Sequence, residues 1–334
     1  MSDLSIPRNS SLRGIVLATA GMLAALTVPL AIAQSDYPNK VILFIVPQAA
    51  GGSTDLLART VGQKLSAALG QSVVVDNRAG ANGIIGTELA AKAAPNGYTL
   101  LVGGTGPLAI NASLYLKLPY DPVRQFTPVA LFGYSTSVLV VHPTMTPATI
   151  GELITQARSK PGQYKYASAG FGSTPHLSAE MFKQMAGVEL LHVPYKGSTP
   201  GVSATISGEV DLMFTGVASA VGHIKSGRLR ALSINGPRRS PALPEVPTAG
   251  ESGLPGFEAD FWIGLFAPAG TPRAVIARLN AEVNKIMTED AMKERFMVIG
   301  VDPAPGTPEQ FGDILAKDIE RWSKSVKGAG LKPE

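Results

Sequence analysis

Short runs rich in Val, Ile and Leu alternate with helical patterns along most of this 334-residue chain. The alternation is clear over residues 41–102 and resumes over residues 165–234. Apolar runs of strand length that alternate with helices are typical of a largely parallel sheet covered by helices. The pattern therefore predicts an α/β fold built from two such sets of strands and helices.

The connections between the two sets indicate how the chain is divided into domains. The run Pro128 to Pro143 leads from the first set into the second, and the chain returns through residues 237–266. Two crossings imply a discontinuous first domain and a hinge. After an expected signal peptide over residues 1–33, we expect domain 1 to begin over 34–135, domain 2 to span 136–253, and domain 1 to be completed by 254–334.

The N-terminus carries the pattern of an export signal. Arg8 and Arg13 precede an apolar run that ends in Ala31-Ile32-Ala33, the small-x-small pattern that signal peptidase cleaves. We expect cleavage after Ala33 and a mature chain in the periplasm. An uncleaved membrane anchor is the alternative, because the run is long enough to span a bilayer, but Pro29 and the small residues favour a signal.

Charge and composition exclude several classes of function. Removal of the signal would lower the formal charge from +4 to +3, because it deletes two Arg and one Asp. The basic residues are scattered and do not alternate with aromatic ones, so we expect no nucleic-acid partner. The chain has no Cys, which excludes disulfides and thiolate chemistry. Its four His lack metal-binding spacing, and we expect no metal and no cofactor.

The segment VPQAAGGSTDLLAR, residues 46–59, joins an apolar strand pattern to a helix through an Ala-Ala-Gly-Gly turn. Backbone N–H groups of such a turn and the positive end of the helix dipole can hold a carboxylate or phosphate without Lys or Arg. A dinucleotide fold is an alternative, because Asp76 ends the next strand. The Gly51-Gly52 pair does not match the G-x-G-x-x-G spacing that this alternative requires.

A second turn of the same kind follows the expected strand Tyr164 to Ser168. Its residues 169–174 offer glycines and hydroxyls, and His176 falls in the first turn of the next helix. For His176 alone, an exposed side chain next to a helix cap is an equally good interpretation. Further glycine-bearing turns occur over residues 103–106 and 195–199. Because ligands collect beyond the carboxyl ends of strands, all four turns can converge on one cleft.

The signals for catalysis are weaker. No G-x-S-x-G motif is present, since the turn Gly197 to Gly201 has Thr at the position of the nucleophile. A triad of Ser173, His176 and Asp211 can be proposed, but a Ser and a His at one helix start are better placed to hold a ligand. An exported hydrolase of small esters or amides remains an alternative. A ligand-sensing interaction protein for a signalling partner is another.

Several segments together resemble the Bug family of periplasmic solute receptors, the binding components of tripartite tricarboxylate transporters. The resemblance lies in VPQAAGGSTDLLAR, NRAGANGIIGTELAAKAAPNGYTLL, LKLPYDPVRQFTPVALF, YASAGFGSTPHLSAEMF, VPYKGSTP and RRSPALPEVPTAGESGLPGFE. These segments occur in the family's order and cover essentially the whole mature chain. The resemblance implies a monomer with two lobes of the periplasmic-binding-protein type II kind, which closes on a small carboxylate and delivers it to membrane permease subunits.

The resemblance also implies which residues face the ligand. From the first lobe these are the turn residues Ala50, Gly51 and Gly52, then Thr105, with Ala81 and Asn82 near the cleft. From the second lobe they are Ser168, Gly172, Ser173, Thr174 and His176, with Lys196, Gly197 and Asp211 as further candidates.

Gln48 departs from the family pattern. Many relatives carry an aromatic residue at this position, so the amide of Gln48 can replace an aromatic wall and alter which acid is bound. Phe171, Tyr195 and Phe214 are possible walls for an aromatic acid. A di- or tricarboxylate, an acidic amino acid and an aromatic acid all stay open.

Overall fold

The computed structural model describes residues 1–3 and 37–328. The chain divides into two units, residues 1–37 and 38–334. Apart from its first three residues, the expected signal peptide and its cleavage site after Ala33 lie outside the described residues. Within the described ranges, no helix combines the length and the apolar character needed to cross a membrane.

The second unit contains two β-sheets, which form the cores of two lobes. The first sheet has the strand order β11-β4-β10-β3-β1-β2 and the second has the order β7-β6-β8-β5-β9. The strands of the first sheet are β1 (Ile42–Val46), β2 (Val73–Asn77), β3 (Thr99–Gly104), β4 (Phe126–Ser135), β10 (Phe261–Pro268) and β11 (Val301–Pro303). Those of the second are β5 (Ser137–Val141), β6 (Lys165–Ser168), β7 (Leu191–Pro194), β8 (Leu212–Gly216) and β9 (Arg230–Ile234).

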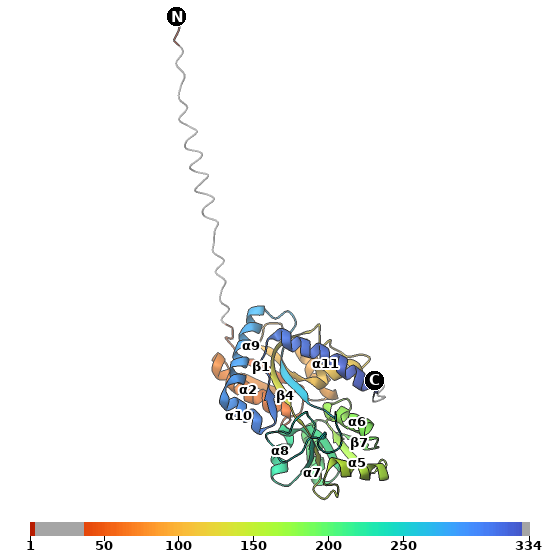
Figure 1. The fold of residues 1–334 in the computed structure, drawn as a ribbon. Helices are drawn as coiled ribbons and strands as arrows, with labels where there is room; N and C mark the ends of the chain where they lie inside the picture. The colour runs from red at the N-terminus through yellow and green to blue at the C-terminus, as the bar shows by residue number, and fades with distance from the viewer. Residues whose placement is uncertain (4–36, 329–334) are drawn as a thin grey trace. The chain divides into compact units, whose positions relative to one another are not determined.

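Helices cover both sheets, as Figure 1 shows. The first lobe carries α2 (Ser53–Leu69), α3 (Ile84–Ala91), α4 (Asn111–Leu114), α9 (Arg273–Thr288), α10 (Asp290–Val298) and α11 (Pro308–Gly328), with the short helices η1 (Ala81–Gly83) and η2 (Gly106–Ile110). The second lobe carries α5 (Ile150–Ser159), α6 (Thr174–Ala186), α7 (Ser198–Ser207) and α8 (Val217–Lys225). The two-lobed α/β fold predicted from the sequence is therefore present.

Both sheets are mixed rather than largely parallel. Strand β1 pairs in parallel with β2 and β3, but β10 lies antiparallel between β3 and β4. In the second sheet β6 is parallel to β7 and β8, and β5 is antiparallel to β8 and β9. The sequence pattern did not predict the antiparallel strands, because they are the strands through which the chain passes between lobes.

Helix α2 shows why the first strand-turn-helix unit forms. Leu57, Val61 and Leu65 recur at helical spacing and are fully buried. The helix ends at Gly70, whose φ of 67° places it in the left-handed region that glycine adopts at little cost. The apolar face of α2 thus fixes the preceding turn at the carboxyl end of β1.

The two passages between lobes lie side by side and are hydrogen-bonded to each other. The amide of Asn235, after β9, donates to the carbonyl of Ser137, at the start of β5 (2.8 Å). The amide of Ser137 in turn donates to Asp260 Oδ1 (2.9 Å), just before β10. Burial raises the pKa of Asp260 to about 7, and the nearby charges of Asp302 and Glu258 add to the rise. The hydrogen bond from Ser137 acts in the opposite direction and lowers this pKa. These residues form the hinge.

The core of the second lobe extends beyond the domain boundary expected from the sequence. Leu254, Phe257 and Ala259 pack in the same apolar cluster as Leu139 and Phe214 of that lobe. The expected division between residues 253 and 254 cuts through this cluster. We therefore propose that the second lobe ends after Ala259.

Candidate ligand-binding site

A cavity of about 260 Å³ lies between the two lobes. Its walls are formed by the turns that follow β1, β2 and β3 in the first lobe and β6, β7 and β8 in the second. Tyr115 and Phe261 complete the lining. The carboxyl ends of strands from both sheets therefore meet at one place, as open α/β sheets favour.

Nine of the fifteen residues predicted to face a ligand line this cavity. They are Gln48, Gly52, Ala81, Asn82, Thr105, Ser173, Thr174, Lys196 and Gly197. The possible aromatic walls Phe171 and Tyr195 also lie there. The fold brings these residues together, and their contact with a ligand remains a prediction.

Four helices begin at the cavity with a glycine as N-cap, but α3, which follows Gly83, continues directly from η1, and the N–H of Ile84 already donates to the carbonyl of Ala81. The other three helices have no helical turn before them. Gly52 precedes α2, Gly197 precedes α7 and Gly216 precedes α8, and all three line the cavity. None of these helices has a side-chain cap hydrogen bond. Their first N–H groups therefore have no capping side chain, although the N–H of Val217 at the start of α8 donates to the carbonyl of Thr136 (2.9 Å). The positive ends of three helix dipoles meet at one cavity. This arrangement favours a bound anion.

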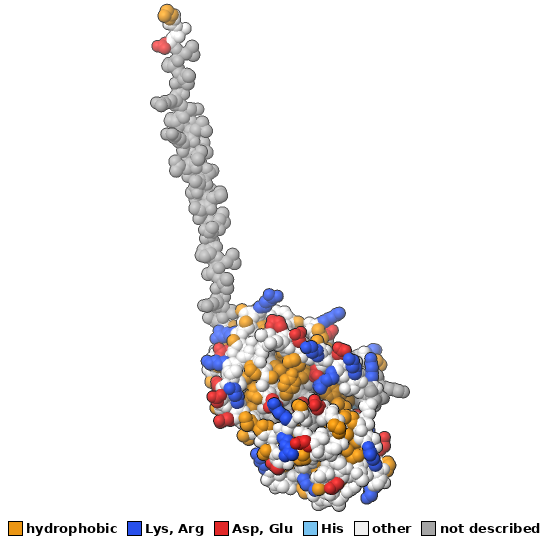
Figure 2. Space-filling model, in the orientation of Figure 1, with side chains coloured by type: hydrophobic (Ala, Val, Ile, Leu, Met, Phe, Trp, Pro, Cys, Tyr) orange, Lys and Arg blue, Asp and Glu red, His pale blue; other side chains and the backbone are white. Residues whose placement is uncertain are grey.

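The charges around the cavity agree with this preference. Lys196 is exposed and carries the only formal charge among the described residues that line the cavity. On the face drawn in Figure 2, acidic and basic side chains are interspersed rather than gathered in one field. No group of three or more His, Asp or Glu within the described ranges could hold a metal ion.

Besides the hydroxyl of Thr54, two hydroxyls at the cavity have no protein partner within the described part of the chain. They belong to Thr174 and Ser198, at the first positions of α6 and α7. The hydroxyl of Thr105, in contrast, accepts the backbone N–H of Trp262 (3.1 Å) and ties β10 to the turn after β3. Thr174 and Ser198 can therefore donate to a ligand without breaking a bond inside the protein.

Ala50 and Gly51 are not among the residues that line the cavity, and their contact with a ligand stays a prediction. The carboxylate of Asp55 accepts the N–H of Gly51 (2.9 Å), so this amide is already satisfied. Burial opposes ionisation of Asp55, but hydrogen bonds from Arg59 and Gly51 lower the pKa of its carboxyl. The carbonyl of Ala50 accepts the hydroxyl of Thr199 (2.8 Å). These two residues lie where the lobes touch.

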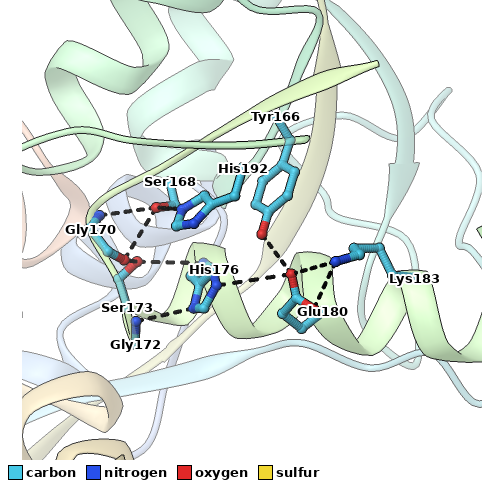
Figure 3. Close-up of polar contacts among 9 residues, drawn as sticks. All are labelled: Tyr166, Ser168, Gly170, Gly172, Ser173, His176, Glu180, Lys183 and His192. Atoms are coloured by element: carbon cyan, nitrogen blue, oxygen red, sulfur yellow. Dashed lines mark hydrogen bonds and ion pairs between the residues drawn. The ribbon is translucent and has the colours of Figure 1, made fainter. Parts of the chain in front are cut away.

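Ser168, Gly172 and His176, at the end of β6, in the β6–α6 turn and in α6, are not among the residues that line the cavity. Figure 3 shows their polar contacts. The N–H of Gly172 donates to Nδ1 of His176 (3.1 Å), whose ring is buried. The hydroxyl of Ser168 lies 2.6 Å from Nε2 of His192. These polar atoms bind the protein itself, and direct contact of the three residues with a ligand stays a prediction.

Asp211 lies at the amino ends of the parallel strands β6 and β8 of the second sheet, opposite the ends that face the cavity. It precedes β8, and its carboxylate accepts the N–H of Lys165 at the start of β6 (2.6 Å). The turns at the cavity follow the strands, so Asp211 is one strand length from them, and the triad considered with Ser173 and His176 does not form. Phe214 is also no wall, because it is fully buried against Phe182 and Phe257.

Four further residues at or behind this site were not predicted from the sequence. Gly216 follows β8 as the other glycine turns follow their strands, so its position was a usable signal. Phe261 begins the returning strand β10, and Tyr115 follows α4. Neither carries a local motif. His192 lies in a short strand, and only its packing on His176 reveals its place.

Comparison with known proteins agrees with this geometry. The sequence profile of the tripartite tricarboxylate transporter family receptor matches residues 57–331. Protein BugT of Bordetella pertussis is 38% identical to this chain over 330 residues, which are 98% of this chain and 99% of BugT.

Solved structures of related proteins have the same fold. A protein of R. palustris, solved with adipate, has a TM-score of 0.87 and 36% identity, over 89% of this chain and 100% of that one. MatC from Rhodopseudomonas palustris, solved with bound malate, has a TM-score of 0.82 and 33% identity, over 87% of this chain and 100% of that one. This family consists of solute receptors and not of enzymes. The chain therefore belongs to the Bug family, the receptors of tripartite tricarboxylate transporters.

Proposed function

We propose that this protein is a periplasmic receptor that closes on a small carboxylic acid and delivers it to the permease subunits of a tripartite transporter. The observation that carries the proposal is the meeting of three glycine-capped helix N-termini at one cavity that no Asp or Glu of the described residues lines. Such termini hold an anion through main-chain N–H groups. The export pattern that ends at Ala33 and the receptor family support the periplasmic location.

The size and lining of the cavity favour a compact dicarboxylate. Its volume of about 260 Å³ is slightly below that of most ligand pockets, which are usually about 300–1,000 Å³. One carboxylate would lie at the helix termini, and Lys196 at the rim would attract the second. Adipate and malate, which relatives bind, have this chemistry.

Contacts across the cleft support a closing mechanism. The hydroxyl of Thr199 donates to the carbonyl of Ala50 (2.8 Å), and the hydroxyls of Ser53 and Ser219 lie 3.2 Å apart. Each pair joins the first lobe to the second. A ligand that touches turns of both lobes would bind better when these pairs are formed, and it would therefore shift the population toward the closed form.

A ligand screen tests the proposal. We expect at least one acid in a panel of mono-, di- and tricarboxylates, acidic amino acids and aromatic acids to raise the Tm in a saturable way. At a hundred times its Kd, such a ligand stabilises the native state by about 2.7 kcal/mol. Calorimetric titration then gives the Kd. If no acid binds while a small ester or amide is hydrolysed, the receptor proposal fails and the hydrolase replaces it.

Lys196→Gln should weaken binding of the acid that the screen identifies only modestly. Because Lys196 is exposed, solvent screens its charge, and an exposed charge pair contributes about 0–1 kcal/mol. We expect a Kd increase of roughly two- to fivefold at low salt and less at 0.5 M salt. The matched control is Lys160→Gln, an exposed lysine outside the cavity, which should leave the Kd unchanged. A loss as large as a hundredfold would contradict the main-chain site.

A further inference from the structure

Two imidazole rings lie stacked behind the β6–α6 turn. His176 comes from α6 and His192 from β7, and their ring centroids are 4.3 Å apart with planes inclined by 24°. His192 also stacks on the ring of Tyr166, at 4.8 Å. Figure 3 shows the rings close to the turn, with the charged side chains of α6 on their other side.

Each ring is bonded to the turn that lines the cavity. Nδ1 of His176 accepts the N–H of Gly172 (3.1 Å). Nε2 of His192 lies 2.6 Å from the hydroxyl of Ser168, which accepts the N–H of Gly170 (3.1 Å). The two histidines thus hold the main chain at two points of one turn.

The same rings also support an aromatic wall of the cavity. Phe171 lies between the two bonded glycines in the sequence, and its ring packs on His176 at 5.0 Å. Both Phe171 and Gly170 line the cavity. A change in the position of His176 would therefore move a wall of the ligand site without any contact between His176 and the ligand.

The bond from Gly172 requires a neutral ring. An imidazole nitrogen that accepts an N–H has its lone pair free, so the proton of His176 is on Nε2. A second proton, on Nδ1, would face the N–H of Gly172, and two donors would then oppose each other. Charging His176 and His192 together would also place two positive charges within one stack.

The ionisable groups that face His176 and His192 do not offset the cost of protonating these rings. Nε2 of His176 is 3.9 Å from Glu180, beyond hydrogen-bond distance. Glu180 already pairs with Lys183 (2.9 Å) and accepts the hydroxyl of Tyr166 (2.7 Å). Burial, followed by the charge of His192, lowers the pKa of His176 to about 4, although Glu180 acts in the opposite direction. Burial also lowers the pKa of His192.

We propose that His176 and His192 are positioning residues that hold the Ala169–Ser173 turn in its ligand-binding conformation, and that they do so only while the ring of His176 is neutral. The inference rests on the proposed function, because the turn is taken to bind the carboxylic acid. In the unfolded chain a histidine takes up its proton near pH 6.5. Because the native ring of His176 binds a proton more weakly, stability is lost as the pH falls from about 6.5 toward 4.

Two substitutions of His176 separate positioning from simple packing. His176→Phe keeps a stacked ring but removes the acceptor for Gly172. His176→Asn places an amide oxygen near the position of Nδ1 and cannot titrate. With adipate as the probe at pH 7.5, we expect His176→Phe to raise the Kd roughly tenfold, because a buried N–H loses its partner. His176→Asn should restore most of the affinity, and His142→Asn, outside the cavity, should leave it unchanged.

Nuclear magnetic resonance of the ligand-free protein tests the charge requirement without a ligand. We expect the amide shift of Gly172 to titrate together with the ring of His176, and to stay constant over the same pH range in His176→Asn. Equal adipate affinities of the Phe and Asn variants, or a Gly172 amide that does not follow the ring, would overturn the inference. If the wild type binds no acid, the proposed function fails, while the amide titration still decides whether the rings hold the turn.

Discussion

Replacing Gly197 with alanine is expected to weaken binding of the carboxylic acid by roughly tenfold to a hundredfold. A Cβ at this position would lie 2.7 Å from the Cβ of Ala49, closer than such atoms approach in proteins. Overpacking of this kind costs about 1–3 kcal/mol. Gly197 belongs to the second lobe and Ala49 to the first, so the collision arises only when the lobes close. The variant should therefore favour the open form.

Gly253→Ala is the matched control for this experiment. Both glycines have φ values that favour glycine, 119° at Gly197 and 104° at Gly253, but nothing lies within 4 Å of a Cβ added at Gly253. Both variants therefore carry backbone strain, and only one carries the collision. Titration calorimetry gives the Kd, and X-ray scattering measures compaction on ligand addition. A Gly197→Ala protein that compacts and binds as tightly as the control would contradict the closing mechanism.

Replacing Asp318 with alanine should have the largest effect on stability. The buried Oδ2 of Asp318 accepts the indole N–H groups of Trp262 (2.7 Å) and Trp322 (3.2 Å). Each buried donor that loses its acceptor costs about 1–3 kcal/mol. We therefore expect the free energy of unfolding to fall by about 3–5 kcal/mol, measured by urea denaturation. The loss of these hydrogen bonds should also disturb the cavity wall, because Trp262 follows the lining residue Phe261 on β10.

Glu320→Ala, on the same helix, controls for the removal of a carboxylate from α11. Glu320 pairs with Lys324 at 2.8 Å, but both side chains are largely exposed. Such a pair contributes about 0–1 kcal/mol. Asp318→Asn is a second comparison, because its amide oxygen can still accept one indole N–H. Equal stabilities of the Asp318→Ala and Glu320→Ala proteins would show that the two indoles do not depend on Asp318.

The sequence predicted that the site lies at the carboxyl ends of the strands, because the direction of the chain determines where each strand ends. A glycine turn that ends a strand lies at the carboxyl edge of its sheet, whatever the neighbouring strands are. Gly52, Thr105, Thr174 and Gly197 were found in this way. Asp211 was expected at the site only from the family resemblance. It precedes β8, so the same rule places it at the opposite end of the strands from the turns.

The positions of buried side chains could not be predicted from the sequence. A histidine in the first turn of a helix can face a ligand or fold back onto its own turn, and local spacing is the same in both cases. His176 folds back because His192 and Phe171 form a slot for its ring. His192 comes from β7, a separate strand, so only tertiary packing decides the choice. The position of β10 between β3 and β4 likewise depends on tertiary packing and not on local sequence.

The glycine caps at the cavity separate the holding of the carboxylate from the choice of the rest of the ligand. A binding site normally uses side chains for both. With glycine at the caps, the N–H groups that would hold the carboxylate belong to the main chain, and a substitution of a lining side chain leaves them in place. The side chains of Gln48 and Phe171 are then free to change with the rest of the ligand. A receptor of this design could evolve from one acid to another through single substitutions, without passing through a form that binds no acid.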